Sequence, residues 1–142
     1  MKKLLMIIVA ICGFASVASA QCGDELMKAA LAAMGNCQYI KDFDIKLAPG
    51  SADGVKFSVV LNSRTKYQVN VANGATNSEN VVIEVFDNEG RLLGTNSSGD
   101  KVYAVFQILC SKTGAYKLHV YAKSKGEACA RAVLSLVEQL SE

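Results

Sequence analysis

The stretch Gly114-Ala115-Tyr116-Lys117-Leu118-His119-Val120-Tyr121 decides the fold. Its apolar side chains recur at every second position from Tyr116 to Val120, and Lys117 and His119 lie between them. This period of two is typical of a β-strand with one face toward a core and the other toward water. The pattern predicts that Tyr116, Leu118 and Val120 are buried and that His119 is a surface residue.

Runs of the same character precede this strand, and turn residues such as Asn, Asp, Ser and Gly separate them. They are Phe57-Ser58-Val59-Val60-Leu61, Tyr67-Gln68-Val69-Asn70-Val71, Val81-Val82-Ile83-Glu84-Val85-Phe86 and Tyr103-Ala104-Val105-Phe106-Gln107-Ile108-Leu109. Short strands at this spacing indicate a mainly β protein, an antiparallel β-sandwich of seven or eight strands. The composition of residues 128–140 suits a strand or a helix, and their alternation favours a strand over 128–137.

One helix is expected before the strands. Residues 24–34 begin with two acids, continue in Ala, Leu and Met, and end before Gly35. An apolar stripe follows one side of this helix: Leu26, Met27, Ala30, Leu31 and Met34. We expect the N-terminal segment 21–36 to be helical and to pack this stripe against the sandwich.

The first twenty residues have the pattern of a signal peptide. Lys2 and Lys3 precede an apolar stretch, and small residues at 18–20 predict cleavage before Gln21. The mature chain is then a single domain, residues 21–142, that is exported to the periplasm or outside the cell. No further apolar run of 18 residues exists that would span a membrane.

Net charge excludes one class of partner. The chain has 15 Lys and Arg against 13 Asp and Glu, and two of the lysines leave with the leader. The mature chain is therefore neutral, with 13 basic and 13 acidic residues. Binding to nucleic acid requires a basic excess, so no nucleic-acid partner is expected.

Four cysteines remain after cleavage: Cys22, Cys37, Cys110 and Cys129. An even number in an exported chain predicts two disulfides. A helix of this length spans roughly 16 Å, and disulfide Cα atoms lie only about 4.4–6.8 Å apart, so Cys22 does not reach Cys37. Cys110 and Cys129 flank a strand and are expected at opposite ends of the sheet. We predict that Cys22 and Cys37 each bond one of Cys110 and Cys129, and which pairs with which stays open.

The order of these strands and turns resembles the bacterial pre-peptidase C-terminal domain, a jelly-roll-like β-sandwich found on secreted proteins. The chain also resembles short exported proteins of Bacteroidetes in Tyr39-Ile40-Lys41-Asp42-Phe43 and Cys110-Ser111-Lys112-Thr113-Gly114. The resemblance covers about residues 37–137 and implies a non-catalytic accessory module. Some relatives bind calcium, and the nearest acids here are Asp42, Asp44 and Asp53. These acids lack a loop with ligands at alternate positions, so no metal site is expected.

No arrangement in the sequence indicates catalysis. His119 is the single histidine, and no local motif places a nucleophile and an acid beside it. Asp42 and Asp44 share one face of a strand, as solvated acids commonly do. Phosphate-binding glycine loops and redox Cys-x-x-Cys pairs are absent from the sequence, so we expect no enzyme and no cofactor.

Two binding functions are compatible with a small exported sandwich. The first is a structural or interaction module for an envelope or secreted protein partner. The alternative is a module for carbohydrate or another ligand, with Tyr103, Tyr121 and His119 as an aromatic platform. The absence of Trp favours the first.

Overall fold

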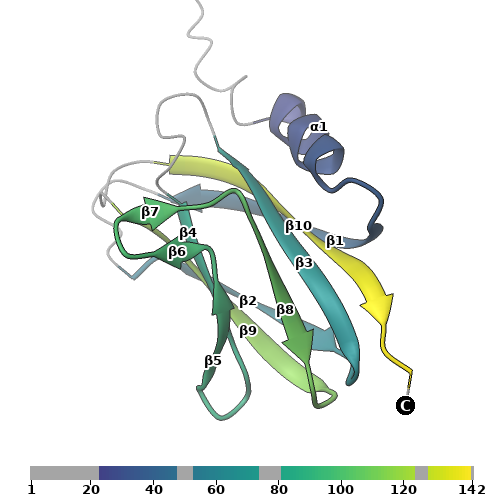
Figure 1. The fold of residues 1–142 in the computed structure, drawn as a ribbon. Helices are drawn as coiled ribbons and strands as arrows, with labels where there is room; N and C mark the ends of the chain where they lie inside the picture. Colours follow the sequence, from purple (N-terminus) through teal and green to yellow (C-terminus); the bar gives the residue numbers. More distant parts are fainter. Residues whose placement is uncertain (1–22, 48–52, 74–80, 124–127, 142) are drawn as a thin grey trace, which may run out of the picture.

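The computed structural model describes residues 23–47, 53–73, 81–123 and 128–141, and Figure 1 shows their arrangement. The predicted signal peptide, Cys22 and the turns expected at Pro49-Gly50 and Gly74 lie outside the described residues. The elements in chain order are α1 (Asp24–Ala33), β1 (Gln38–Leu47), β2 (Val55–Leu61), β3 (Thr65–Asn73), β4 (Val81–Phe86), β5 (Leu92–Thr95), β6 (Ser97–Ser98), β7 (Lys101–Val102), β8 (Val105–Cys110), β9 (Gly114–Ala122) and β10 (Ala128–Gln139).

Two four-stranded antiparallel sheets form the sandwich. One has the strand order β1-β10-β3-β8 and the other β2-β9-β4-β5, while β6 and β7 pair as a short ribbon. Every pairing is antiparallel. The predicted fold class, a mainly β, jelly-roll-like sandwich with one N-terminal helix, is therefore confirmed.

The core lies between the two sheets. Tyr116, Leu118 and Val120 are buried on β9, as their alternation predicts, and they pack with buried side chains of the opposite sheet such as Ile45 and Leu134. Lys117 is exposed on the other face of β9. The face assignment made from the sequence is thus confirmed.

The ambiguous C-terminal segment is a strand. β10 lies between β1 and β3, in the middle of its sheet. Ala130, Ala132 and Leu134 face the core, while Val133 and Ser135 on the opposite face are also buried. Because both faces of β10 are covered, its Ala- and Leu-rich composition suits a central strand.

The helix lies over the outer face of this first sheet, above β10 and β3 (Figure 1). Leu26 and Ala30 are its buried side chains, whereas Leu31 is 38% exposed. The apolar stripe is therefore narrower than predicted, because polar side chains of β3 occupy part of the interface. The buried Asn70 amide donates to the Ala30 carbonyl at 2.7 Å, and the Gln68 amide donates to the Met34 carbonyl at 3.2 Å.

The predicted disulfide arrangement is wrong for two of the four cysteines. Cys37 and Cys110 are free thiols, and Cys110 is buried. Cys37 precedes β1, whereas Cys110 ends β8 at the far edge of the same sheet, with β10 and β3 between them. Three strand spacings of about 4.8 Å exceed the Cα separation of a disulfide. Cys129 is also beyond reach of Cys37, because it pairs with Lys46 near the other end of β1.

Cys129 is disulfide-bonded. Cys110 and Cys129 do lie at opposite ends of the sheet, as predicted. Thr65 of β3 pairs with both Cys110 and Gln139, so Cys110 lies near the end of β10, whereas Cys129 lies at its start. The Cys110 thiol instead donates to the Tyr116 hydroxyl at 3.2 Å. This hydrogen bond and burial raise the pKa of Tyr116 to about 12.

Candidate functional site

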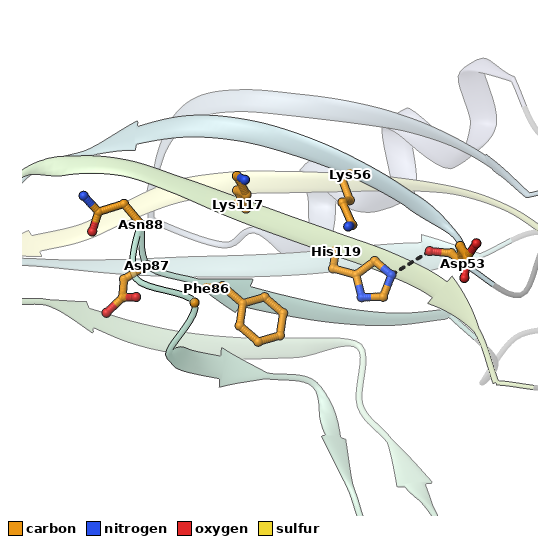
Figure 2. Close-up of a pocket in the computed structure, with 8 residues that line it drawn as sticks. Asp53, Lys56, Phe86, Asp87, Asn88, Lys117 and His119 are labelled. Atoms are coloured by element: carbon orange, nitrogen blue, oxygen red, sulfur yellow. Dashed lines mark hydrogen bonds between the residues drawn. The ribbon is translucent and has the colours of Figure 1, made fainter.

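The outer face of the second sheet holds a cleft of about 630 Å³, which no helix of the described chain covers (Figures 1 and 2). Strand register explains how it forms. Lys56 on β2 lies opposite His119 on β9, and His119 lies opposite Glu84 on β4. Two residues earlier on β9, Lys117 lies opposite Phe86 of β4. The residues that line the cleft are Asp53, Lys56, Phe86, Asp87, Asn88, Gly90, Lys117 and His119.

His119 is held in the cleft by contacts at both ring nitrogens. Its Nε2 lies 2.7 Å from the Asp53 carbonyl oxygen, and its Nδ1 lies 3.2 Å from Glu84 Oε1 (Figure 2 shows the first bond). The side chain is 24% exposed. The sequence placed His119 on the correct face, but the ring is half-buried and bonded at both nitrogens. Both ring nitrogens of His119 therefore have partners within the protein.

A glycine places the Asp53 carbonyl beside this ring. Gly54 has a φ of +66°, and a Cβ at this position would lie 2.0 Å from the Val120 carbonyl oxygen. Only glycine, which has no side chain, allows the chain just before β2 to approach β9 this closely. The backbone at Gly54 therefore determines one of the two bonds of His119.

We expect Gly54→Ala to cost about 1–2 kcal/mol for the left-handed conformation and to move Asp53 away from His119. Gly99→Ala is the matched control, since Gly99 has a φ of +60° with nothing within 4 Å of its Cβ position. Urea denaturation measures the stability of both variants, and NMR reports the His119 ring signals. Only Gly54→Ala should shift those signals; unchanged ring signals would contradict the role of Gly54.

The turn between β4 and β5 closes one end of the cleft. Asp87 accepts hydrogen bonds from the backbone N–H groups of Glu89 and Arg91 at 2.9 and 2.8 Å, and from Arg91 Nε at 3.0 Å. The backbone hydrogen bond from Arg91 is the main cause that lowers the pKa of Asp87 below its usual value. This carboxylate therefore organises the turn that presents Asn88 and Phe86.

The three acids considered for calcium do not come together. Asp42 and Asp44 lie on β1 and contact Arg131, at 3.2 and 3.5 Å respectively. Asp53 lies beside His119 at the second sheet. Within residues 23–47, 53–73, 81–123 and 128–141, no three His, Cys, Asp or Glu side chains form a group that could hold a metal ion.

The proposed aromatic platform forms only in part. The rings of His119 and Tyr121 lie 5.3 Å apart. Burial, and then the Glu84 carboxylate, raise the pKa of Tyr121. Tyr103 lies between β7 and β8, where its N–H donates to the Asn96 carbonyl. Sequence reasoning did not find Lys56, Phe86 or Asn88 as site residues, because only the strand register brings them beside His119.

Comparisons with known proteins support the fold. No protein-family model and no curated protein matches the chain. The solved structures that are similar to the chain include two from bacteria. One is the crystal structure of Aeromonas hydrophila PliG, a periplasmic lysozyme inhibitor of g-type lysozyme, with a TM-score of 0.51 and 16% identity over 72% of this chain and 89% of that chain.

The other is the pre-peptidase C-terminal domain of a collagenase from Bacillus anthracis. It has a TM-score of 0.51 and 15% identity, over 68% of this chain and 89% of that chain. At these identities the likeness concerns the fold alone. The fold is that of a pre-peptidase C-terminal-like β-sandwich, as the resemblance in sequence implied. In the described part of the chain, no helix is both long and apolar enough to cross a membrane.

Proposed function

We propose that this protein is a non-catalytic, exported module that binds an envelope or secreted protein through the outer face of the β2-β9-β4-β5 sheet. The observation that carries the proposal is the open cleft on this face, in which His119 is bonded at both nitrogens. An open cleft lined by charged, polar and aromatic side chains suits recognition.

Export follows from the leader over 1–20, with residues 21–142 as one domain in the periplasm or outside the cell. The Cys129 disulfide agrees with an oxidising compartment, and we propose Cys22 as its partner. The first partner to test is a g-type lysozyme, because the similar Aeromonas structure is a periplasmic inhibitor of such an enzyme.

The test uses the oxidised mature chain, immobilised, against purified g-type lysozyme and against envelope extracts with mass-spectrometric identification. Ser58→Tyr places a bulky ring on the proposed face, since the exposed Ser58 lies opposite Lys117. Lys46→Tyr is the control, because Lys46 is exposed on β1 of the other sheet. We expect to find one partner that binds the parent chain and Lys46→Tyr with similar affinity. The same partner should bind Ser58→Tyr at least about tenfold more weakly. Equal binding by all three chains would contradict this face as the interface.

A carbohydrate-binding module is the second candidate. The observation that favours it is Phe86, whose half-buried ring lines the cleft beside the exposed amide of Asn88. Sugar rings stack on aromatic faces while amides bind their hydroxyls. Glycan-array binding that is lost in Phe86→Ala would favour this function over protein binding.

A further inference from the structure

Two acidic side chains at the cleft have hydrogen-bonding partners, whereas its two lysines have no ion-pair partner in the described part of the chain. The Glu84 carboxylate contacts His119, and the Asp87 carboxylate is bonded to Arg91 and to two backbone N–H groups. Both acids are thus engaged by neighbours on their own sheet or turn. Neither carboxylate forms an ion pair with the two lysines that line the cleft.

Lys56 and Lys117 are these lysines. They are exposed on adjacent strands and on one face, at diagonal positions, because Lys56 pairs with His119 and Lys117 lies two residues before it. The Cα atoms of diagonal neighbours across antiparallel strands lie about 7–8 Å apart. In the described part of the chain neither ammonium group has an ion-pair partner.

Like charges on one face of a sheet repel each other, and an anion bound between the two ammonium groups offsets this repulsion. Asp53 also lines the cleft, and within the described residues its carboxylate forms no ion pair with either lysine. Asp53 lies at the His119 end of the cleft, whereas Phe86 and Asn88 lie toward its other end (Figure 2). The lining residues at the Lys117 end are Phe86, Asn88 and Asp87, and the Asp87 carboxylate is already bonded to Arg91.

We propose that this cleft binds an acidic side chain, Asp or Glu, from a segment of the protein partner, with its carboxylate between Lys56 and Lys117. The inference rests on the proposed function and names the chemistry of the partner. Phe86 contacts the methylene groups of that side chain, and the Asn88 amide donates to its backbone. Since the mature chain has 13 basic and 13 acidic residues, attraction of an acidic segment would come from these two lysines and not from the net charge of the chain.

The experiment is an NMR titration of the ¹⁵N-labelled oxidised mature chain with an acetylated hexaglutamate peptide, and with hexaglutamine as the neutral probe. We expect hexaglutamate to shift the amide signals of Lys56, Lys117 and Asn88, and hexaglutamine to leave them in place. Lys56→Gln/Lys117→Gln should weaken binding at least about tenfold, and raising the salt to about 0.15 M should weaken it further.

Lys46→Gln is the matched control, an exposed strand lysine on the other sheet, and should bind hexaglutamate like the parent. The inference is overturned by the absence of a shift at the cleft, by equal shifts with hexaglutamine, or by equal weakening in Lys46→Gln. Tighter binding of an oligogalacturonate than of hexaglutamate overturns it in favour of an acidic glycan.

The inference and the proposed function fail separately. If the partner found in the binding experiment is lost in Ser58→Tyr but binds Lys56→Gln/Lys117→Gln like the parent, the interface stands and the acidic side chain is excluded. If Ser58→Tyr binds the partner normally while hexaglutamate still binds between the lysines, the carboxylate site exists but is not the partner's interface.

Discussion

Replacing Leu118 with Ala is expected to lower the free energy of unfolding by about 2–5 kcal/mol. Leu118 is 1% exposed and lies in the centre of the second sheet, between Phe57 of β2 and Val85 of β4. Truncation removes apolar area and leaves a cavity, because neighbours on both strands and in the opposite sheet hold the surrounding space open. Urea denaturation followed by circular dichroism measures the change.

The control lies in the adjacent residues. Lys117→Ala should cost less than about 0.5 kcal/mol, as for an ordinary exposed position. His119→Ala should cost less than about 1 kcal/mol, because its contact with Glu84 is partly exposed to solvent. A larger loss in Lys117→Ala than in Leu118→Ala would mean that the two faces of β9 are reversed.

Strands in which apolar and polar residues alternate could be predicted, because burial of one face produces this alternation in the sequence. β9 is the clearest example, and β10 was recognised by the same period despite its helix-like composition. The three short strands β5, β6 and β7 showed no such alternation. Leu92–Thr95 has four residues and Lys101–Val102 has two, within a segment rich in Asn, Ser and Gly that reads as a series of turns.

Strand order and register could not be predicted from the sequence. Which cysteines can pair and which residues line the cleft both depend on them. The order β1-β10-β3-β8 separates Cys37 from Cys110 by two intervening strands. No local pattern reports which strands are neighbours, because pairing depends on the whole chain. In the same way, Lys56 and Glu84 join His119 only through the registers of β2 and β4 with β9.

Asn96 is another residue that the sequence did not single out, and its loss is expected to be among the most damaging substitutions. Its side chain is 1% exposed. Asn96 Oδ1 accepts from the Ile83 N–H at 2.8 Å, and Asn96 Nδ2 donates to the carbonyls of Val81 and Tyr103, each at 3.0 Å. One amide thus ties the end of β5 to β4 and to the chain entering β8.

Asn96→Ala should cost about 2–4 kcal/mol, because it leaves three backbone groups without this partner at a buried position. Asn96→Asp should cost at least as much at neutral pH. It keeps the shape and the acceptor for Ile83, but it turns the donor into a charged oxygen that faces two carbonyls. Asn62→Ala is the control, since Asn62 is exposed in the turn between β2 and β3, and it should stay within about 0.5 kcal/mol of the parent.

Hydrogen exchange distinguishes a local from a global origin of this loss. If Asn96 holds β5 and β8 to β4 as the bonds indicate, the Ile83 amide should exchange faster in Asn96→Ala than global unfolding alone explains, because its acceptor is gone. The Leu118 amide, in the neighbouring β9, should follow global stability. Asn96→Ala with unchanged stability and a still protected Ile83 amide would show that these three bonds do not hold the strands together.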